Sequence, residues 1–242
     1  MADLFANVAD GSIVSDTVGT WAGARDDTDG NAVSAGGNST SNFVQVHRFA
    51  GRSGTTFRVG RSFMYFDTSG ITGNVSAATI KIYGSNGNDC AVIAVKSNAY
   101  GGDGGTALAT TDLDAIVGYS AGANLAGNAT IYGNINSSWN TSAYNSLSGT
   151  SDLMADMQNN DIVIVAFLDY SNDYRNSTPG STVSNNSGGT FANYSSTSRD
   201  PVIVYTEDAA SGYANNLSGV ATANIGKVIS VATANVSKVI GV

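Results

Sequence analysis

The fold is decided by the stretch Arg61-Ser62-Phe63-Met64-Tyr65-Phe66-Asp67-Thr68-Ser69-Gly70-Ile71, the densest aromatic run in the sequence. Successive side chains of a β-strand point to opposite faces, so Phe63 and Tyr65 share one face while Met64 and Phe66 share the other. Because both faces are apolar, we expect this strand to be covered on both sides, as at the centre of a sandwich. The turn-forming residues that follow it, 67–70, end the strand.

Other strands are expected where apolar or alternating segments are bounded by Gly, Asn or Asp. The clearest are residues 43–49, 77–83, 89–96, 161–170 and 200–206, and we expect 77–83 and 89–96 to pair as a hairpin. The apolar patch Trp21–Ala24 is interpreted as a short strand. Helical spacing favours a helix over 141–157, in two pieces broken near Ser148-Gly149.

The composition is that of a turn-rich β protein. Of the 242 residues, 42% are hydrophobic and 29 are Gly, whereas only 12% are charged, about half of the usual ~25%. We therefore expect one large all-β domain over residues 1–206, a linker over 207–216 and a C-terminal segment over 217–242.

The net charge of −8 argues against nucleic acid and against anionic membrane surfaces as partners. No apolar stretch approaches the ~20 residues that cross a bilayer. Residues 1–10 lack the basic and apolar regions of a signal peptide, so we expect synthesis in the cytoplasm.

The side chains that usually carry catalysis are scarce. His47, Cys90 and Glu207 are the single His, Cys and Glu of the chain, which excludes a zinc site built on several His. A catalytic triad on His47 would lack the Gly-x-Ser-x-Gly elbow. Cys90 lies in an apolar run and is interpreted as a small buried residue. We expect no enzymatic activity and no cofactor, although a glycosidase built on two Asp is a further alternative.

The segment 25–31 is rich in Asp and ends in Gly. Asp27 and Asp29 have the spacing found in calcium loops, but the bidentate Glu downstream is missing. A plain Asp/Asn/Gly loop is the favoured interpretation, and a calcium site on Asp27 and Asp29 is the alternative.

The C-terminal segment is a repeat. Residues 220–230 are followed directly by a second copy, 231–241, with eight of 11 positions identical. Its β-branched and glycine content favours short strands and turns over a helix. Two copies cannot bury their own apolar faces, so we expect the segment to assemble with itself or with another protein through these side chains: Val220, Ile225, Val228, Ile229, Val231, Val236, Val239 and Ile240.

The stretches 61–71 and 76–83 resemble the R-x-F-x-x-F-D-T-S-x-I … S-A-T-L-x-L-Y pattern of bacterial and phage jelly-roll domains similar to the DNRLRE type of carbohydrate-binding module. Residues 200–206 fit the closing strand of that pattern, and the resemblance covers roughly residues 12–206. It implies a jelly-roll β-sandwich, with one or two short helices, that binds or assembles and does not catalyse. The repeats resemble the C-terminal repeats of phage virion structural proteins.

Three functions follow as hypotheses. The first is a virion structural protein (a fibre, spike or capsid-decoration protein) that lies on the virion surface with other virion proteins and forms a homo-oligomer, with three copies expected by analogy with fibres. The second is a carbohydrate-binding module or adhesin that contacts surface glycans. The third is a subunit of an extracellular filament. Under the second hypothesis, four aromatic side chains are candidates to stack on a sugar, although burial in the core is the favoured interpretation for most of them: Trp21, Trp139, Tyr100 and Tyr174.

Overall fold

A computed structural model describes residues 1–35, 41–180, 184–195, 198–208, 227–228 and 231–232 of the 242-residue chain. The strands are β1 (Ala2–Phe5), β2 (Gly11–Val18), β3 (Ala32–Ala35), β4 (Ser41–Gly51), β5 (Gly54–Asp67), β6 (Asn74–Asn88), β7 (Val92–Lys96), β8 (Ile131–Asn136), β9 (Tyr144–Ser148), β10 (Ile162–Asp169), β11 (Ser184–Ala192), β12 (Val202–Asp208), β13 (Lys227–Val228) and β14 (Val231–Ala232). The helices are α1 (Trp21–Arg25) and α2 (Ser151–Asn159), with short helical turns η2 (Tyr100–Gly102), η3 (Thr110–Asp112) and η4 (Tyr170–Tyr174).

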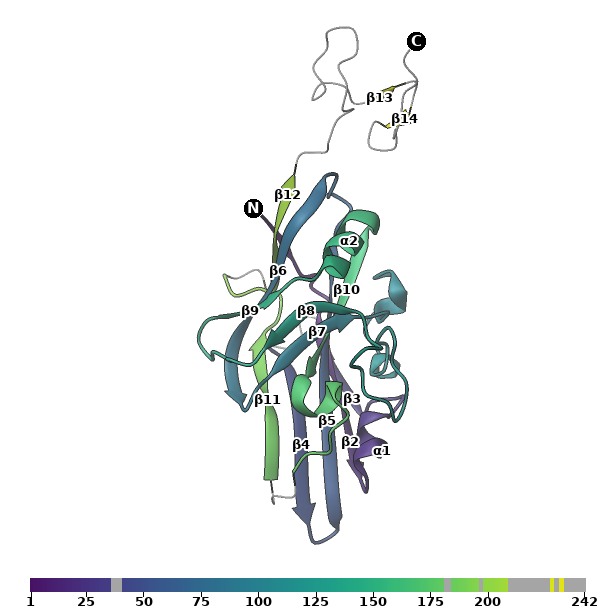
Figure 1. The fold of residues 1–242 in the computed structure, drawn as a ribbon. Coiled ribbons are helices and arrows are strands. Elements are labelled where there is room, and N and C mark those ends of the chain that lie inside the picture. Colours follow the sequence, from purple (N-terminus) through teal and green to yellow (C-terminus); the bar gives the residue numbers. More distant parts are fainter. Residues whose placement is uncertain (36–40, 181–183, 196–197, 209–226, 229–230, 233–242) are drawn as a thin grey trace.

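Within the described residues, twelve strands join in one antiparallel sheet with the order β1-β12-β6-β11-β4-β5-β10-β7-β8. Strand β2 lies on the other edge of β5 and carries β3, while β9 pairs with β6. The long strand β6 pairs with β12 through its first half and with β11 through its second half. The sheet therefore curls over itself (Figure 1), and the expected all-β sandwich is confirmed.

The central stretch behaves as its two apolar faces predict. Phe63 belongs to one buried cluster, whereas Met64 and Phe66 belong to another on the opposite side of β5, and all three side chains are fully buried. Burial of side chains of this size stabilises a fold by about 1.5–3 kcal/mol each. Strand β5 is therefore the shared wall of two cores.

The first core fills the space between the two halves of the curled sheet, and α2 covers it through Leu153 and Met157. Its other large members include side chains of β5, β6, β8, β9, β10, β11 and β12: Met64, Phe66, Ile80, Ile82, Tyr132, Leu147, Val165, Phe167, Phe191 and Ile203. The second core lies on the other face of β5, β7 and β10. There the cover is the loop-rich segment 97–130 rather than a second sheet, with Tyr100, Leu113 and Leu125 as its buried side chains.

The expected hairpin between 77–83 and 89–96 is wrong. Strand β6 pairs with β9, β11 and β12, whereas β7 pairs with β8 and β10. The two strands lie on opposite sides of the first core, because Ile80 and Ile82 of β6 and Val92 and Ala94 of β7 all point into it. Alternating apolar residues mark a strand but do not choose its neighbour.

One segment expected as a strand is a helix, and one expected as a helix is partly a strand. Trp21–Ala24 is not a strand but the start of α1, where Thr20 accepts a hydrogen bond from the backbone of Gly23 at 3.1 Å and caps the helix. The expected helix over 141–157 is strand β9 in its first part and α2 in its second part. The break lies near Ser148-Gly149, as expected, and the side chain of Thr150 caps α2 by accepting from Leu153.

Strand β12 continues to Asp208, so Glu207 and Asp208 of the expected linker belong to the sheet. Of the side chains expected to drive assembly, Val228 and Val231 lie in β13 and β14, where their backbones pair directly in an antiparallel ladder. The other positions lie outside the described residues: Val220, Ile225, Ile229, Val236, Val239 and Ile240. None of the helices in the described part of the chain has the length and apolar character needed to span a membrane.

Candidate functional site

Three of the four aromatic side chains that were candidates for glycan contact are buried, as the favoured interpretation predicts for most of them. Tyr100 is fully buried, and its hydroxyl donates to the carbonyl oxygen of Phe63 at 2.8 Å. Burial raises the pKa of Tyr100 well above its usual value. Tyr174 is 4% exposed and stacks on Tyr170, with ring centroids 5.5 Å apart. Both rings are committed to the second core, so neither is placed to meet a sugar.

Trp21 is also buried. Its ring packs edge-on against Phe57, and its indole nitrogen donates to the side chain of Asn176 at 3.0 Å. These contacts join α1 to β5 and to the loop after η4. Trp139, by contrast, is only partly buried, so it is the one of the four expected side chains that a ligand can reach.

The Asp-rich segment around residues 26–31 behaves as a loop. Ser15 donates to the carboxylate of Asp27 at 2.8 Å, and the backbone nitrogen of Asp29 donates to the same carboxylate at 3.2 Å. Among the described residues, no three His, Cys, Asp or Glu side chains gather as metal ligands would. These hydrogen bonds are those of an Asp-rich loop, and the calcium site on Asp27 and Asp29 stays a prediction.

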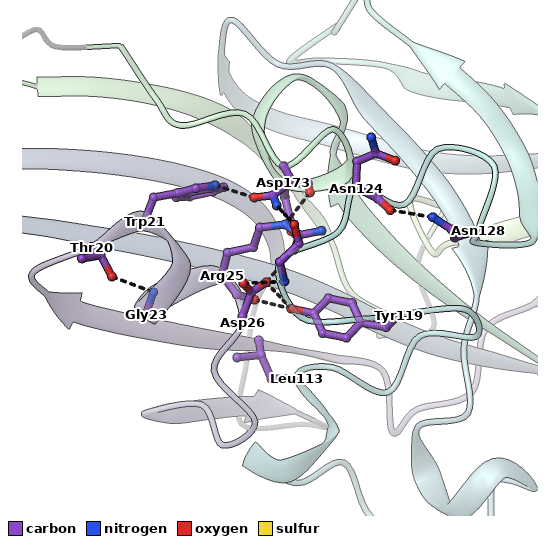
Figure 2. Close-up of polar contacts among 12 residues, drawn as sticks. Thr20, Trp21, Gly23, Arg25, Asp26, Leu113, Tyr119, Asn124, Asn128 and Asp173 are labelled. Carbon is purple, nitrogen blue, oxygen red and sulfur yellow. Dashed lines mark hydrogen bonds and ion pairs between the residues drawn. The ribbon is translucent and has the colours of Figure 1, made fainter.

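The largest concentration of buried charge lies where α1, β5 and η4 meet. Arg61 donates twice to the carboxylate of Asp173, at 2.8 Å each, and all three side chains of Arg25, Arg61 and Asp173 are fully buried. Arg25 donates to the backbone oxygen of Asp173 at 2.9 Å and to the carboxylate of Asp26 at 2.6 Å. Figure 2 shows Arg25, Asp26, Tyr119 and Asp173 converging at this point.

The ring of Tyr119 lies beneath both guanidinium groups, with centroid distances of 5.4 Å to Arg25 and 5.2 Å to Arg61. Two cations and the two carboxylates of Asp26 and Asp173 balance, which offsets the cost of burying them. This cluster has no access to solvent through its arginines, so it joins elements of the fold and does not form a binding site. The pairing of Arg61 with Asp173 could not be predicted from the sequence, because the two residues are far apart in the chain.

An open hollow of about 270 Å³ lies on the outer face of the sheet over β4, β11 and the end of β6. Val44 and Val46 of β4 point into the protein, so the alternate residues Phe43, Gln45 and His47 point outward and line the hollow. We call this the β4 hollow. Apart from Val44, the rest of its lining is polar or glycine: Asn86, Gly87, Asn88, Ser187, Gly188, Gly189 and Thr190.

Glycine shapes the floor of the β4 hollow. Gly60 of β5 pairs with Gln45 of β4, and a Cβ at Gly60 would lie 2.6 Å from the ring of Phe43. The missing side chain therefore lets the Phe43 ring lie down on the sheet. Gly188 has a φ of +142°, where a Cβ would lie 2.2 Å from the backbone oxygen of Val44, so this position requires glycine.

The β4 hollow contains hydrogen-bonding groups but no net charge. Among the lining residues that the structure describes, none is Asp or Glu. Burial and the nearby positive charge of Arg58 lower the pKa of His47, so its imidazole is neutral near pH 7. Arg58 is itself paired with Asp16 by two hydrogen bonds of 2.5 and 2.6 Å.

One buried atom of His47 lacks a partner. The Nδ1 atom of His47 is buried and makes no hydrogen bond within the described residues. A buried polar atom without a partner is costly and uncommon in folded proteins.

A second hollow, of about 620 Å³, adjoins the first and shares Gly87 and Asn88 with it. We call it the Trp139 hollow. Its lining combines the indole of Trp139 with hydroxyl, amide and carboxylate groups: Asn88, Asp89, Ser137, Ser138 and Thr141. The Trp139 ring rests on Gly87 and Gly189, where added Cβ atoms would lie 2.3 and 2.6 Å from it.

Cys90 also lines the Trp139 hollow, but it is not a nucleophile. Its side chain is 6% exposed, and burial, together with the negative charge of Asp169, raises the pKa of the thiol to about 12. The reactive form of cysteine is the thiolate, which is almost absent here at neutral pH. The expectation of a small buried residue at Cys90 is confirmed.

Sequence reasoning identified Trp139 but missed the β4 hollow. Its floor is made by glycines that meet across strands, such as Gly87 and Gly189 of β6 and β11, and this pairing depends on a register that the sequence does not reveal. A scan against models of known protein families found no match, and a search of curated proteins found no significant relative either.

Proposed function

We propose that the sandwich is a non-enzymatic carbohydrate-binding domain and that the β4 and Trp139 hollows take up a neutral, hydroxyl-rich saccharide. The observation that carries this proposal is the pair of open hollows that combine the partly exposed indole of Trp139 and the ring of Phe43 with amides such as Gln45. Amides and a neutral imidazole offer both donors and acceptors to hydroxyl groups. Open, shallow hollows suit a chain that passes across the surface.

The aromatic and polar groups of the two hollows complement the two kinds of surface on a sugar ring. Phe43 offers an apolar face on the outer side of the sheet, where Gln45, Asn88 and Thr190 line the same hollow as hydrogen-bonding groups. Trp139 offers an apolar face on the inner side, because it covers Gly189, which pairs with the inward-pointing Val44. Few precisely placed polar groups in an otherwise apolar or neutral site are typical of small-molecule sites. The neutral lining of the β4 hollow favours an uncharged saccharide over an acidic one.

A glycan array probed with the full-length protein tests this proposal. We expect one or more neutral glycans to bind, and we expect the variant Gln45→Ala to weaken that binding by roughly tenfold, the effect of losing one or two hydrogen bonds. Gln158→Ala is the matched control, because Gln158 lies on α2, outside the lining of both hollows. An array without hits, or equal losses in both variants, would contradict the proposal.

A second function rests on a separate observation, the two 11-residue repeats after the sandwich. We propose that the chain is a structural protein of a virion, in which the repeats join copies of the chain or dock on another virion protein while the sandwich is displayed. In Figure 1, β1 and the end of β12 lie at one end of the sandwich and the β4–β5 turn lies at the other. This arrangement is compatible with attachment at the β12 end and exposure of the opposite end of the sandwich. An extracellular filament subunit is the alternative assembly.

Light scattering after size exclusion tests the assembly proposal. We expect the full-length chain to be an oligomer, with three copies as the specific expectation, and a chain ending at Asp208 to be a monomer, since β12 ends there. A monomeric full-length protein would contradict self-assembly. Particles of increasing length in the electron microscope would favour the filament.

A further inference from the structure

The boundary between the two hollows carries a reactive backbone segment. Asn86-Gly87 is the sole Asn-Gly pair in the 242 residues of the sequence. Both residues are exposed near the end of β6. An asparagine followed by glycine is open to attack on its side chain by the next backbone nitrogen, because glycine has no Cβ to hinder the approach.

The folded chain holds the reacting groups together. The backbone nitrogen of Gly87 donates to the side-chain oxygen of Asn86 at 2.9 Å. This hydrogen bond places the nitrogen beside the amide carbon that it would attack. Holding reacting atoms near each other in this way removes part of the entropic cost of reaction. The register of β6 against β11 shifts next to Asn86, so the strand ladder is irregular at this point.

A hydrogen bond from Trp139 is a second feature of the fold that favours the reaction. Its indole nitrogen donates to the backbone oxygen of Asn86 at 2.7 Å. That oxygen belongs to the same peptide group as the nitrogen of Gly87, so negative charge spreads onto it when the nitrogen loses its proton. A donor aimed at a developing negative charge stabilises that charge. The indole therefore favours the deprotonated, nucleophilic form of the Gly87 nitrogen.

We propose that Asn86 is a site of spontaneous deamidation promoted by Trp139. Hydroxide removes the proton of the Gly87 nitrogen, and the nitrogen then forms a bond to the side-chain carbon of Asn86. The side-chain nitrogen leaves as ammonia, which produces a succinimide ring. Water then adds to one of the two ring carbonyls and breaks its bond to nitrogen, which leaves aspartate or isoaspartate at position 86.

The product places a negative charge at the boundary between the two hollows, close in sequence to Asp89. Isoaspartate would in addition insert an extra carbon into the backbone of β6. We expect either product to weaken the binding of a saccharide, and this consequence rests on the proposed function. The deamidation itself does not.

Incubation of the full-length protein at mildly alkaline pH, followed by peptide mass spectrometry and isoaspartate detection, tests the proposal. We expect Asn86 to deamidate faster than Asn136, which precedes Ser137 and lies on the nearby strand β8. We also expect the folded chain to react faster at Asn86 than a synthetic peptide of residues 83–91, which has no tryptophan. A slower reaction in the folded chain would overturn the proposal.

Two matched variants isolate the indole. Trp139→Phe removes one hydrogen bond and should slow the reaction at Asn86 roughly fivefold. Trp21→Phe is the control, because the indole of Trp21 donates to Asn176 instead and should leave the rate unchanged. Circular dichroism checks that both variants fold, and the peptide comparison remains decisive if one does not. An unchanged or faster reaction in Trp139→Phe would show that the indole plays no part.

Discussion

Asp10 predicts an unusual dependence of stability on pH. Its side chain is fully buried; one carboxylate oxygen accepts from Asn42 at 2.7 Å and from the backbone of Tyr194 at 3.0 Å. The other oxygen makes no hydrogen bond within the described residues. Burial, which outweighs these hydrogen bonds, raises the pKa of Asp10 from 3.8 to about 7. The folded protein therefore holds a proton on Asp10 that the unfolded chain has already released at pH 5 to 6.

The sign follows from this difference in bound protons. Because the pKa of Asp10 is higher in the folded state, its favourable contribution is complete below pH 3.8 and is lost as the pH rises to about 7. A difference of this size corresponds to about 4 kcal/mol. Asp169, whose pKa burial raises to about 6, acts in the same direction. We expect the protein to be less stable at pH 8 than at pH 5.

The variant Asp10→Asn tests this reasoning, because asparagine keeps the acceptor oxygen but cannot ionise. Urea unfolding between pH 5 and 8 gives the free energy of unfolding at each pH. We expect the variant to lose much of the pH dependence and to be more stable than the original protein at pH 8, by up to about 4 kcal/mol. A variant that is less stable at pH 8, with the same slope against pH, would refute the reasoning.

Three further predictions follow from the buried groups. Asp173→Asn leaves Arg61 buried beside a neutral partner and should lower the free energy of unfolding by about 3–5 kcal/mol. Asp16→Asn breaks an ion pair whose side chains are 36% and 33% exposed, and should lower it by under about 1 kcal/mol. Equal losses of stability in thermal melts of the two variants would contradict this. Cys90 should react with iodoacetamide at pH 8 roughly a thousandfold more slowly in the folded than in the unfolded chain, as its raised pKa requires; equal rates would exclude that environment. Gly60→Ala should displace the Phe43 ring and cost about 1–3 kcal/mol in urea unfolding, and an unchanged stability would show that the ring has room to move.

Much of the strand pattern could be predicted from the sequence, because burial on two faces leaves a local signature. Phe63 and Met64 alternate between the two cores as their positions require. The strand 161–170 was likewise expected, and β10 occupies residues 162–169. The partners of these strands could not be predicted, since register and neighbour depend on the whole fold. The separation of β6 from β7 across the first core is the clearest instance.

The site was harder to predict than the fold. Tryptophan and tyrosine serve equally well as core residues and as sugar-binding residues, so composition could not separate Trp139 from the buried Tyr100. The difference arises from glycine, because Gly87 and Gly189 provide the surface on which Trp139 rests. Those glycines meet only after β6 and β11 pair. The unpartnered nitrogen of His47 likewise depends on the packing around it.

Hydrogen exchange on the full-length protein, with and without a neutral glycan that binds on the array, tests the central proposal most directly. The account predicts slower amide exchange in the segments that line the two hollows, residues 43–47, 86–91, 137–141 and 187–190, and unchanged exchange in α2. Protection confined to other segments, or a protein for which no glycan changes the exchange at all, would contradict the assignment of carbohydrate binding to these hollows.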